Sequence, residues 1–258
     1  MNYKVNAENE RWSIFFDIEG FSNFDKMKRY RSFDLLISTI YKIGSKVYPN
    51  SPERLFVHHI GGDSIIIVSD FSEEDLTRPI SIAIVLQRML IVNNYIGKAG
   101  IALGDFADIS GTWTNFYKLV EKDLPKKEVL GDLIPVKYDK SKIFLGDGII
   151  TLIPVLGDSL VNSYKTQNNG PKCPNIIVSN INERKIPNNF IKYRSEFYTL
   201  INWVNISSIE IDKICNKMGE YKLLDTGFIH KKYKNYLNGI ENDVSYKWLE
   251  NAKKLEEI

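Results

Sequence analysis

The chain has 258 residues, of which 43% are hydrophobic, so it carries enough apolar sequence for a sizeable core. Its formal net charge is only +2, which gives no electrostatic reason to expect a nucleic-acid partner, and its two cysteines are too few for a zinc motif or a disulfide framework. No apolar run is long enough to span a membrane, and the polar N-terminus lacks the apolar segment of a signal peptide, so we expect a cytoplasmic protein.

The first half of the chain predicts the element order β-α-β-β-α-β. Strands are predicted from apolar, β-prone runs at about 12–18, at 54–69 (two strands joined by a tight Gly-Gly-Asp-Ser turn) and at 98–104. Apolar residues at helical spacing predict one helix over 34–47 and another over roughly 73–94, with Pro79 near its first turn. This order is that of a ferredoxin-like fold, within a mixed α/β (α+β) architecture.

The second half is less regular. Residues 123–156 mix proline, glycine and lysine with β-branched residues, and no strand can be assigned there. The remaining segments are expected to form a helix, a strand and two more helices, at 160–167, at 176–179, near 209–219 and near 243–256. Ser208 is a residue type that caps helices. We therefore divide the chain into a core domain at 1–207 and a C-terminal helical extension at 208–258 that packs on it.

Two acidic residues lie at the ends of predicted core strands. Asp17 ends the apolar run that begins at Trp12, and Asp63 lies at the tip of the predicted hairpin. A glycine near each acid lets backbone or a ligand approach closely. Carboxylates on neighbouring strand ends can hold divalent cations, and two-metal sites recur in phosphoryl transfer, so the pair predicts a site for two Mg²⁺ or Mn²⁺ ions. Taken singly, each acid could instead accept hydrogen bonds from the amides of its own turn.

Four sequence blocks, in order and at similar spacing, resemble the class III nucleotide cyclases. The blocks are Phe16-Asp-Ile-Glu-Gly-Phe21, Ile60-Gly-Gly-Asp63, Lys98-Ala-Gly-Ile-Ala-Leu-Gly104 and Gly157-Asp-Ser-Leu-Val-Asn-Ser-Tyr-Lys165. The fourth block, together with Tyr246-Lys-Trp-Leu249, looks most like the Pycsar cyclases, bacterial anti-phage enzymes that make cyclic UMP or cyclic CMP. The resemblance implies a cyclase catalytic domain over 1–207 with a ferredoxin-like core of the class III type. It also implies the conversion of UTP or CTP to the 3′,5′-cyclic monophosphate and pyrophosphate.

The resemblance implies a role for each matching residue. The metal ligands would be Asp17, Asp63 and the backbone carbonyl of Ile18. The triphosphate would be bound by Lys98 and by the amides of Glu19, Gly20 and Phe21, where the chain enters its first helix. Glu19 could be a third metal ligand, but its side chain is expected to point to the face opposite Asp17.

Two lysines replace arginines of the family. Lys98 stands at the triphosphate-binding position, and Lys165 stands at the catalytic position that stabilises the transition state. Both keep the positive charge but lose the planar fork that grips two oxygens. Val161 stands where many family members have asparagine. These changes leave open a non-catalytic, dimeric nucleotide-sensing module as an alternative function.

The positions that read the base depart most from adenylate cyclases. His59 and Pro154 stand where those enzymes have a lysine and an acid. A proline offers neither a charge nor a hydrogen-bond donor, so it cannot read the amino group of adenine. The two changes fit a pyrimidine, with UTP favoured over CTP because cyclic-UMP enzymes are the commoner members of the resembling family. A buried, hydrogen-bonded histidine is the plainer interpretation of His59.

The family shares each active site between two subunits. The resemblance therefore implies a homodimer, with Asp17, Asp63 and Lys98 from one subunit and Lys165 and the base pocket from the other. Neither a nucleic acid nor a membrane is expected as a partner. A diguanylate-cyclase-like enzyme is a further alternative, since the blocks that hold the two acids also fit that family. Its hairpin, however, carries Glu-Phe where this chain has Ser64-Ile65.

Overall fold

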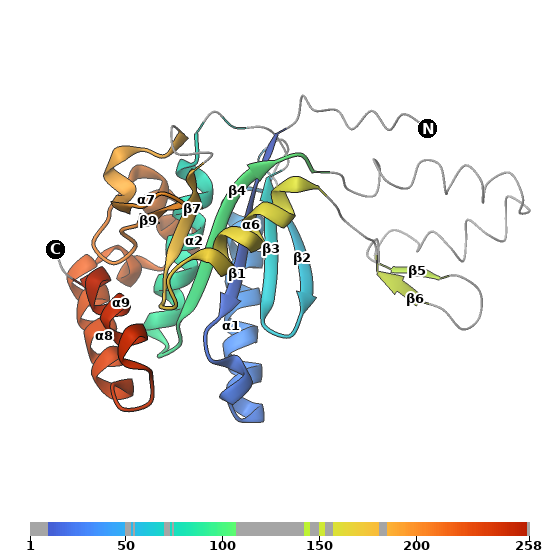
Figure 1. Ribbon diagram of the computed structural model, residues 1–258. Helices are drawn as coiled ribbons and strands as arrows, with labels where there is room; N and C mark the ends of the chain where they lie inside the picture. The colour runs from blue at the N-terminus through green and yellow to red at the C-terminus, as the bar shows by residue number, and fades with distance from the viewer. Residues whose placement is uncertain are drawn as a thin grey trace, which may run out of the picture.

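The computed structural model describes residues 10–49, 53, 55–69, 73, 75–106, 142–144, 150–152, 157–180 and 185–256. Its strands are β1 (Arg11–Ile18), β2 (Leu55–Gly61), β3 (Ser64–Ser69), β4 (Gly97–Gly104), β5 (Lys142–Phe144), β6 (Ile150–Leu152), β7 (Ile176–Ser179), β8 (Ile191–Arg194) and β9 (Tyr198–Ile201). Its α-helices are α1 (Lys26–Lys46), α2 (Thr77–Val92), α6 (Asp158–Asn169), α7 (Ile209–Met218), α8 (Thr226–Ile240) and α9 (Tyr246–Glu256). Seven strands form one sheet in the order β2-β3-β1-β4-β7-β9-β8, while β5 and β6 pair with each other (Figure 1).

The first six elements form a ferredoxin-like core. They follow the order β1-α1-β2-β3-α2-β4, and their strands lie in the spatial order β2-β3-β1-β4 with every neighbouring pair antiparallel. Strand β7 then adds to β4 in parallel, and β9 and β8 extend the sheet by antiparallel pairing. The predicted mixed α/β class and the β-α-β-β-α-β order are therefore confirmed.

The two faces of the sheet have different covers. Alternate residues of β1, among them Trp12 and Phe16, are fully buried in the large core that also holds the apolar side chains of α1 and α2. Phe15 points the other way and packs with Leu160 of α6. Figure 1 shows α6 crossing one face of the sheet, with α1 and α2 behind the other. The period of two along β1 thus separates a deep core from a shallow face that α6 covers in part.

Two glycines of β4 explain how closely α6 lies on the sheet. A Cβ at Gly100 would lie 2.3 Å from the carbonyl oxygen of Ser163, and a Cβ at Gly104 would lie 2.5 Å from the amide of Ser159. Both distances are too short for any side chain. The glycines of the third resemblance block therefore serve helix–sheet packing, and they bring the backbone of α6 against β4.

The C-terminal helices pack on the same core as the sheet. Ile214 of α7, Tyr233 of α8 and Leu255 of α9 are buried within one cluster with residues of the sheet and of α2. The guanidinium of Arg88, on α2, also donates to backbone carbonyls of the chain after β9, at Trp203, Val204, Ile206 and Leu223. A division into domains between residues 207 and 208 stays a prediction.

The element boundaries differ from the predictions at a few places. Helix α1 begins at Lys26, before the predicted start at residue 34. Its first turns carry exposed charged residues, so the sequence has no apolar stripe there that would predict a helix. Helix α8 and strands β8 and β9 were missed. Helix α8 has only three buried positions, separated by lysines and asparagine, so its apolar pattern is weak. Strands β8 and β9 have only four residues each, which is too short for a clear alternation. Ser208 caps α7 as predicted, since its hydroxyl accepts from the amide of Ile211.

Two further expectations from the sequence concern membrane-spanning helices and the segment 123–156. Across the residues that the structure describes, no helix combines the length and the apolar character that a membrane span requires. Within 123–156, where no strand could be assigned, the structure has the three-residue strands β5 and β6.

Candidate functional site

A row of polar side chains crosses three strands at one end of the sheet. Asp17, near the end of β1, pairs with Ser64 of β3 on one side and with Lys98 of β4 on the other. Directly opposed residues on neighbouring strands share a face. Phe15, two residues before Asp17, lies against Leu160 of α6, so the polar row lies on the α6 face of the sheet.

The row is joined by a hydrogen bond and ion pairs. The hydroxyl of Ser64 donates to Oδ1 of Asp17 at 2.8 Å. Nζ of Lys98 lies 3.2 Å from Oδ2 of Asp17 and 3.5 Å from Oε2 of Glu19. Burial acts to lower the pKa of Lys98, but the charges of Glu19 and Asp17 outweigh it and raise that pKa. The ammonium is therefore firmly charged and is shared by two carboxylates.

Asp63 reaches the same place from the β2–β3 hairpin. Gly62 has a φ of 66°, a left-handed conformation that suits glycine and makes a two-residue turn of Gly62 and Asp63. Burial raises the pKa of Asp63 to about 6, and the charge of Asp17 and a side-chain hydrogen bond with it raise it too, while a backbone hydrogen bond and Lys98 oppose the shift. The structure thus places the carboxyl groups of Asp17 and Asp63 close enough for the charge of one to affect the other. Their role as metal ligands stays a prediction.

The donors present suit a hard divalent cation. No group of three or more histidine, cysteine, aspartate or glutamate side chains that could hold a metal occurs among the described residues. The donors that the prediction assigns to the ions are the carboxylates of Asp17 and Asp63 and a backbone oxygen, while the carboxylate of Glu19 pairs with Lys98. The side chain of Ile18 is buried in the core, so only its backbone can face an ion. Mg²⁺ prefers oxygen ligands and keeps several waters, so one or two carboxylates suffice for it.

The turn after β1 differs from the predicted phosphate-binding turn. The amide of Glu19 donates to the carbonyl of Ile96 at 3.0 Å and is engaged, which leaves the amides of Gly20 and Phe21 as candidates. Gly20 has a φ of 74° and leads into a short 3₁₀ turn, Phe21–Asn23. Helix α1 starts only at Lys26, so the expectation that these amides form its N-terminus is wrong.

The Glu19 side chain is also placed differently from the prediction. It was expected on the face opposite Asp17, yet both side chains reach the same ammonium of Lys98. That expectation is wrong, because residues two positions apart along a strand share a face, and Glu19 keeps this placement although it follows directly after the end of β1 at Ile18.

Of the other predicted site residues, Lys165 is the one whose side chain the structure describes, and it is not part of this row. Lys165 lies on the exposed side of α6, near the exposed Val161 and Tyr164, and it makes no ion pair or side-chain hydrogen bond with any other residue in the described part of the chain. His59 pairs with Ile65 through the backbone of β2. The His59 side chain and the whole of Pro154 lie outside what the structure describes.

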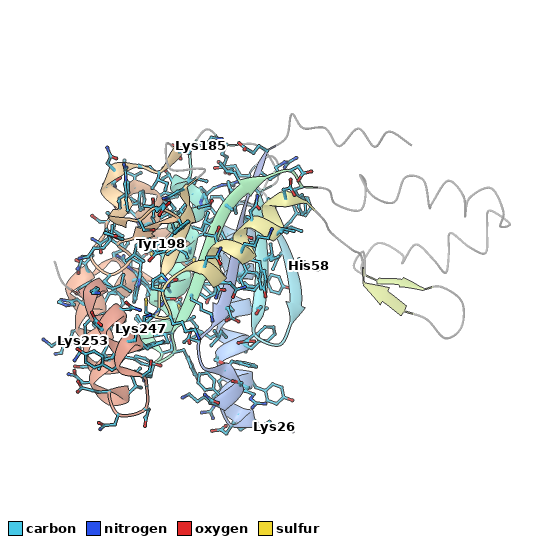
Figure 2. All side chains as sticks on the ribbon, in the orientation of Figure 1. Lys26, His58, Lys185, Tyr198, Lys247 and Lys253 are labelled. Atoms are coloured by element: carbon cyan, nitrogen blue, oxygen red, sulfur yellow. The ribbon has the colours of Figure 1, made fainter. Side chains whose placement is uncertain are left out.

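A cavity beside the polar row was not predicted from the sequence. Its volume is about 540 Å³, and it is lined by Phe21, Phe24, Asp25, Lys26, Arg29, Tyr30, Phe33 and Gly62. Phe21 follows the turn after β1 and Gly62 precedes Asp63, so the cavity borders both turns of the candidate site. Figure 2 shows Lys26 at the free end of α1. The aromatic residues around the charged start of α1 were a sequence signal for this cavity. The sequence could not show that they gather, because this depends on how α1 packs beside the β2–β3 hairpin.

No protein-family model and no curated protein sequence matches this chain. Among the solved structures that are similar in part are two cyclases. One is the active GGEEF domain of a diguanylate cyclase from Vibrio cholerae, with 16% identity, a TM-score of 0.31, and coverage of 38% of this chain and 64% of that chain. The other is a bacterial light-regulated adenylyl cyclase, with 11% identity, a TM-score of 0.43, and coverage of 83% and 57%. The chain thus spans less than two thirds of either structure, and at these scores the functional conclusion depends on its own residues.

Proposed function

We propose that this chain is a nucleotide cyclase that converts a pyrimidine nucleoside triphosphate to the 3′,5′-cyclic monophosphate and pyrophosphate. The observation that supports this most is the proximity of the carboxyl groups of Asp17, near the end of β1, and Asp63, in the β2–β3 turn. The pKa of Asp63 is raised first by burial and then by the charge of Asp17, and a bound cation would offset the repulsion between the two acids. The four blocks that resemble class III cyclases supply the reaction type.

Each residue of the site has a part in the proposed reaction. Asp17, Asp63 and the carbonyl of Ile18 would hold two Mg²⁺ or Mn²⁺ ions, which supply the positive charge that makes the ribose 3′-hydroxyl more acidic and offsets charge on the phosphates. Lys98 would bind the triphosphate, with the amides of Gly20 and Phe21. The catalysis would therefore rest on positioning and charge stabilisation, with the 3′-hydroxyl attacking the α-phosphate in line.

The proposal includes a homodimer with shared sites. Lys165 would act on the site of a second subunit, and its exposure on α6 without an ion pair among the described residues is compatible with this. The base would be read at His59 and Pro154, and their departure from adenylate cyclases favours UTP, with CTP as the alternative. The role in anti-phage signalling comes from the resemblance to Pycsar cyclases.

The test is an assay of the purified full chain with each of the four nucleoside triphosphates and Mn²⁺. Cyclic UMP or cyclic CMP is the expected product. Cyclic di-GMP would instead assign the chain to the diguanylate cyclases, and binding without turnover would make it a sensor. Asp17→Ala and Asp63→Ala are the matched variants, and turnover in a folded double variant would reject the metal assignment.

A further inference from the structure

The ammonium of Lys98 has two acidic partners, and they are not equivalent. Asp17 lies across the strand pair from Lys98, 3.2 Å from its Nζ, and is also a proposed metal ligand. Glu19 lies in the turn, 3.5 Å from the same Nζ. All three side chains are partly buried, at 18%, 26% and 29% exposure for Asp17, Glu19 and Lys98. Water therefore screens these pairs less than it screens surface pairs.

The backbone fixes the position of Glu19 independently of the ion pair. Its amide donates to Ile96, two residues before Lys98, so the turn is tied to the start of β4. The strands are also in close contact at this point, because a Cβ at Gly97 would lie 3.0 Å from the carbonyl oxygen of Asp17. The amide of Gly97 in turn donates to Oε1 of Gln87 on α2. Glu19 is thus held next to Lys98 even when the side chains move.

The two partners of Lys98 behave differently once cations bind. A cation bound to Asp17 and the ammonium of Lys98 are both positively charged. The cation would therefore repel the ammonium from Oδ2 of Asp17. Glu19 then remains as the acid that holds Lys98. It is not a third metal ligand in this arrangement, because the described acids do not gather in a group of three that could hold an ion.

We propose that Glu19 is a positioning residue: it keeps the Lys98 ammonium at the edge of the site after Asp17 has been taken by cations, and so presents it to the triphosphate. This inference rests on the proposed function. Its predicted effect on anion binding is opposite to the effect expected from the change in charge alone. Removing an acid next to a site for a polyanion should strengthen anion binding, whereas the loss of a residue that orients a lysine should weaken it.

The experiment is titration calorimetry of the full chain with inorganic tripolyphosphate in the presence of Mn²⁺, a ligand that needs neither a base nor turnover. Glu19→Gln is expected to weaken binding by about tenfold, the size of one charge-assisted contact. In the Lys98→Gln background the same change should not weaken binding further, because no ammonium is left to position. Thermal unfolding of each variant verifies its fold.

Glu10→Gln is the matched control. Glu10 pairs with Lys185 at 2.7 Å, just before the opposite end of β1, and Figure 2 shows Lys185 far from Lys26 and the start of α1. This variant removes the same charge from a lysine pair and should bind as the wild type does. If wild-type protein binds no tripolyphosphate with Mn²⁺, the proposed function and this inference both fail. If it binds, and Glu19→Gln binds equally or more tightly, only the inference fails.

Discussion

At the scale of single residues, Asp63 has the most informative environment in the site. Its pKa of about 6 lies above the ordinary value of 3.8, first because of burial and then because of Asp17. Between these two pH values the folded protein binds more protons than the unfolded chain. Its contribution to stability is therefore lost as the pH rises from about 4 to about 6, and above that range the ionised pair destabilises the fold.

This sign predicts a pH-dependent effect of Asp63→Asn. In EDTA at pH 7.5 the variant should be more stable than the wild type by about 1 kcal/mol, which corresponds to a rise of about 2–4 °C in unfolding temperature. The value is small because the Asp63 side chain is partly exposed and water screens its charge. The difference should shrink towards pH 4, where Asp63 is protonated in the folded state and about half protonated in the unfolded chain. Asp34→Asn, at an exposed acid of α1, is the control and should stay close to the wild type.

The same unfolding experiment also reports on metal. Excess Mn²⁺ should raise the unfolding temperature of the wild type but not that of Asp63→Asn, because a ligand stabilises only the protein that binds it. A constant difference between the two proteins from pH 4 to 7.5 would contradict the assigned environment of Asp63. An equal response of both to Mn²⁺ would contradict its role as a ligand.

At the scale of elements, the contact of α6 with β4 determines how the second half of the chain meets the first. The strand positions of the core could be predicted because β1, β3 and β4 are apolar runs that end at acids or glycines. The reason for the β4 glycines could not be predicted. Gly100 and Gly104 look like ordinary strand glycines until a helix from residues 158–169 is placed against them.

Gly100→Ala should destabilise the protein by about 2–3 kcal/mol or more, because its Cβ would overlap the backbone of α6 at Ser163. Denaturant unfolding measures this change. Gly44→Ala is the matched control: Gly44 lies inside α1 with nothing within 4 Å of its Cβ position. That substitution should stabilise the protein by roughly 0.5–1 kcal/mol through helix propensity. Equal effects at the two glycines would show that α6 does not lie so closely on the sheet.

At the scale of the whole molecule, one buried arginine joins the ferredoxin-like core to the C-terminal part. Arg88 is fully buried, and its guanidinium donates to carbonyls of the chain at 203–206 and of Leu223. Burial lowers the pKa of Arg88 to about 10, so it stays charged at neutral pH. The hydrogen bonds to carbonyl oxygens offset the cost of burying that charge.

Arg88→Met should destabilise the protein by roughly 2–4 kcal/mol, because it leaves several buried carbonyls without donors. Denaturant unfolding followed by the tryptophan fluorescence of the chain measures this loss. Arg31→Met, at an exposed position of α1, is the control and should change stability little. A loss no larger than that of the control would mean that the C-terminal part holds to the core without Arg88.

Complementation tests the proposed sharing of sites between subunits. A mixed dimer of an Asp17→Ala subunit and a Lys165→Ala subunit should recover activity, because one of its two sites would have every residue intact. Each variant alone should be inactive. The readout is cyclic nucleotide formed by a purified mixed dimer with a different affinity tag on each subunit. Inactivity of such a dimer would place Lys165 and Asp17 in the same subunit's site or leave Lys165 without a role.

The sequence by itself determined the order of elements in the core and the two acids at strand ends, because the alternation of apolar residues and the glycines beside Asp17 and Asp63 are local signals. Only the tertiary structure decided which groups meet there. The register of β1 with β4 placed Lys98 opposite Asp17, and the turn after Ile18 brought Glu19 to the same ammonium. Such meetings join residues about 80 positions apart, and they depend on strand pairing and chain direction, which no local pattern encodes.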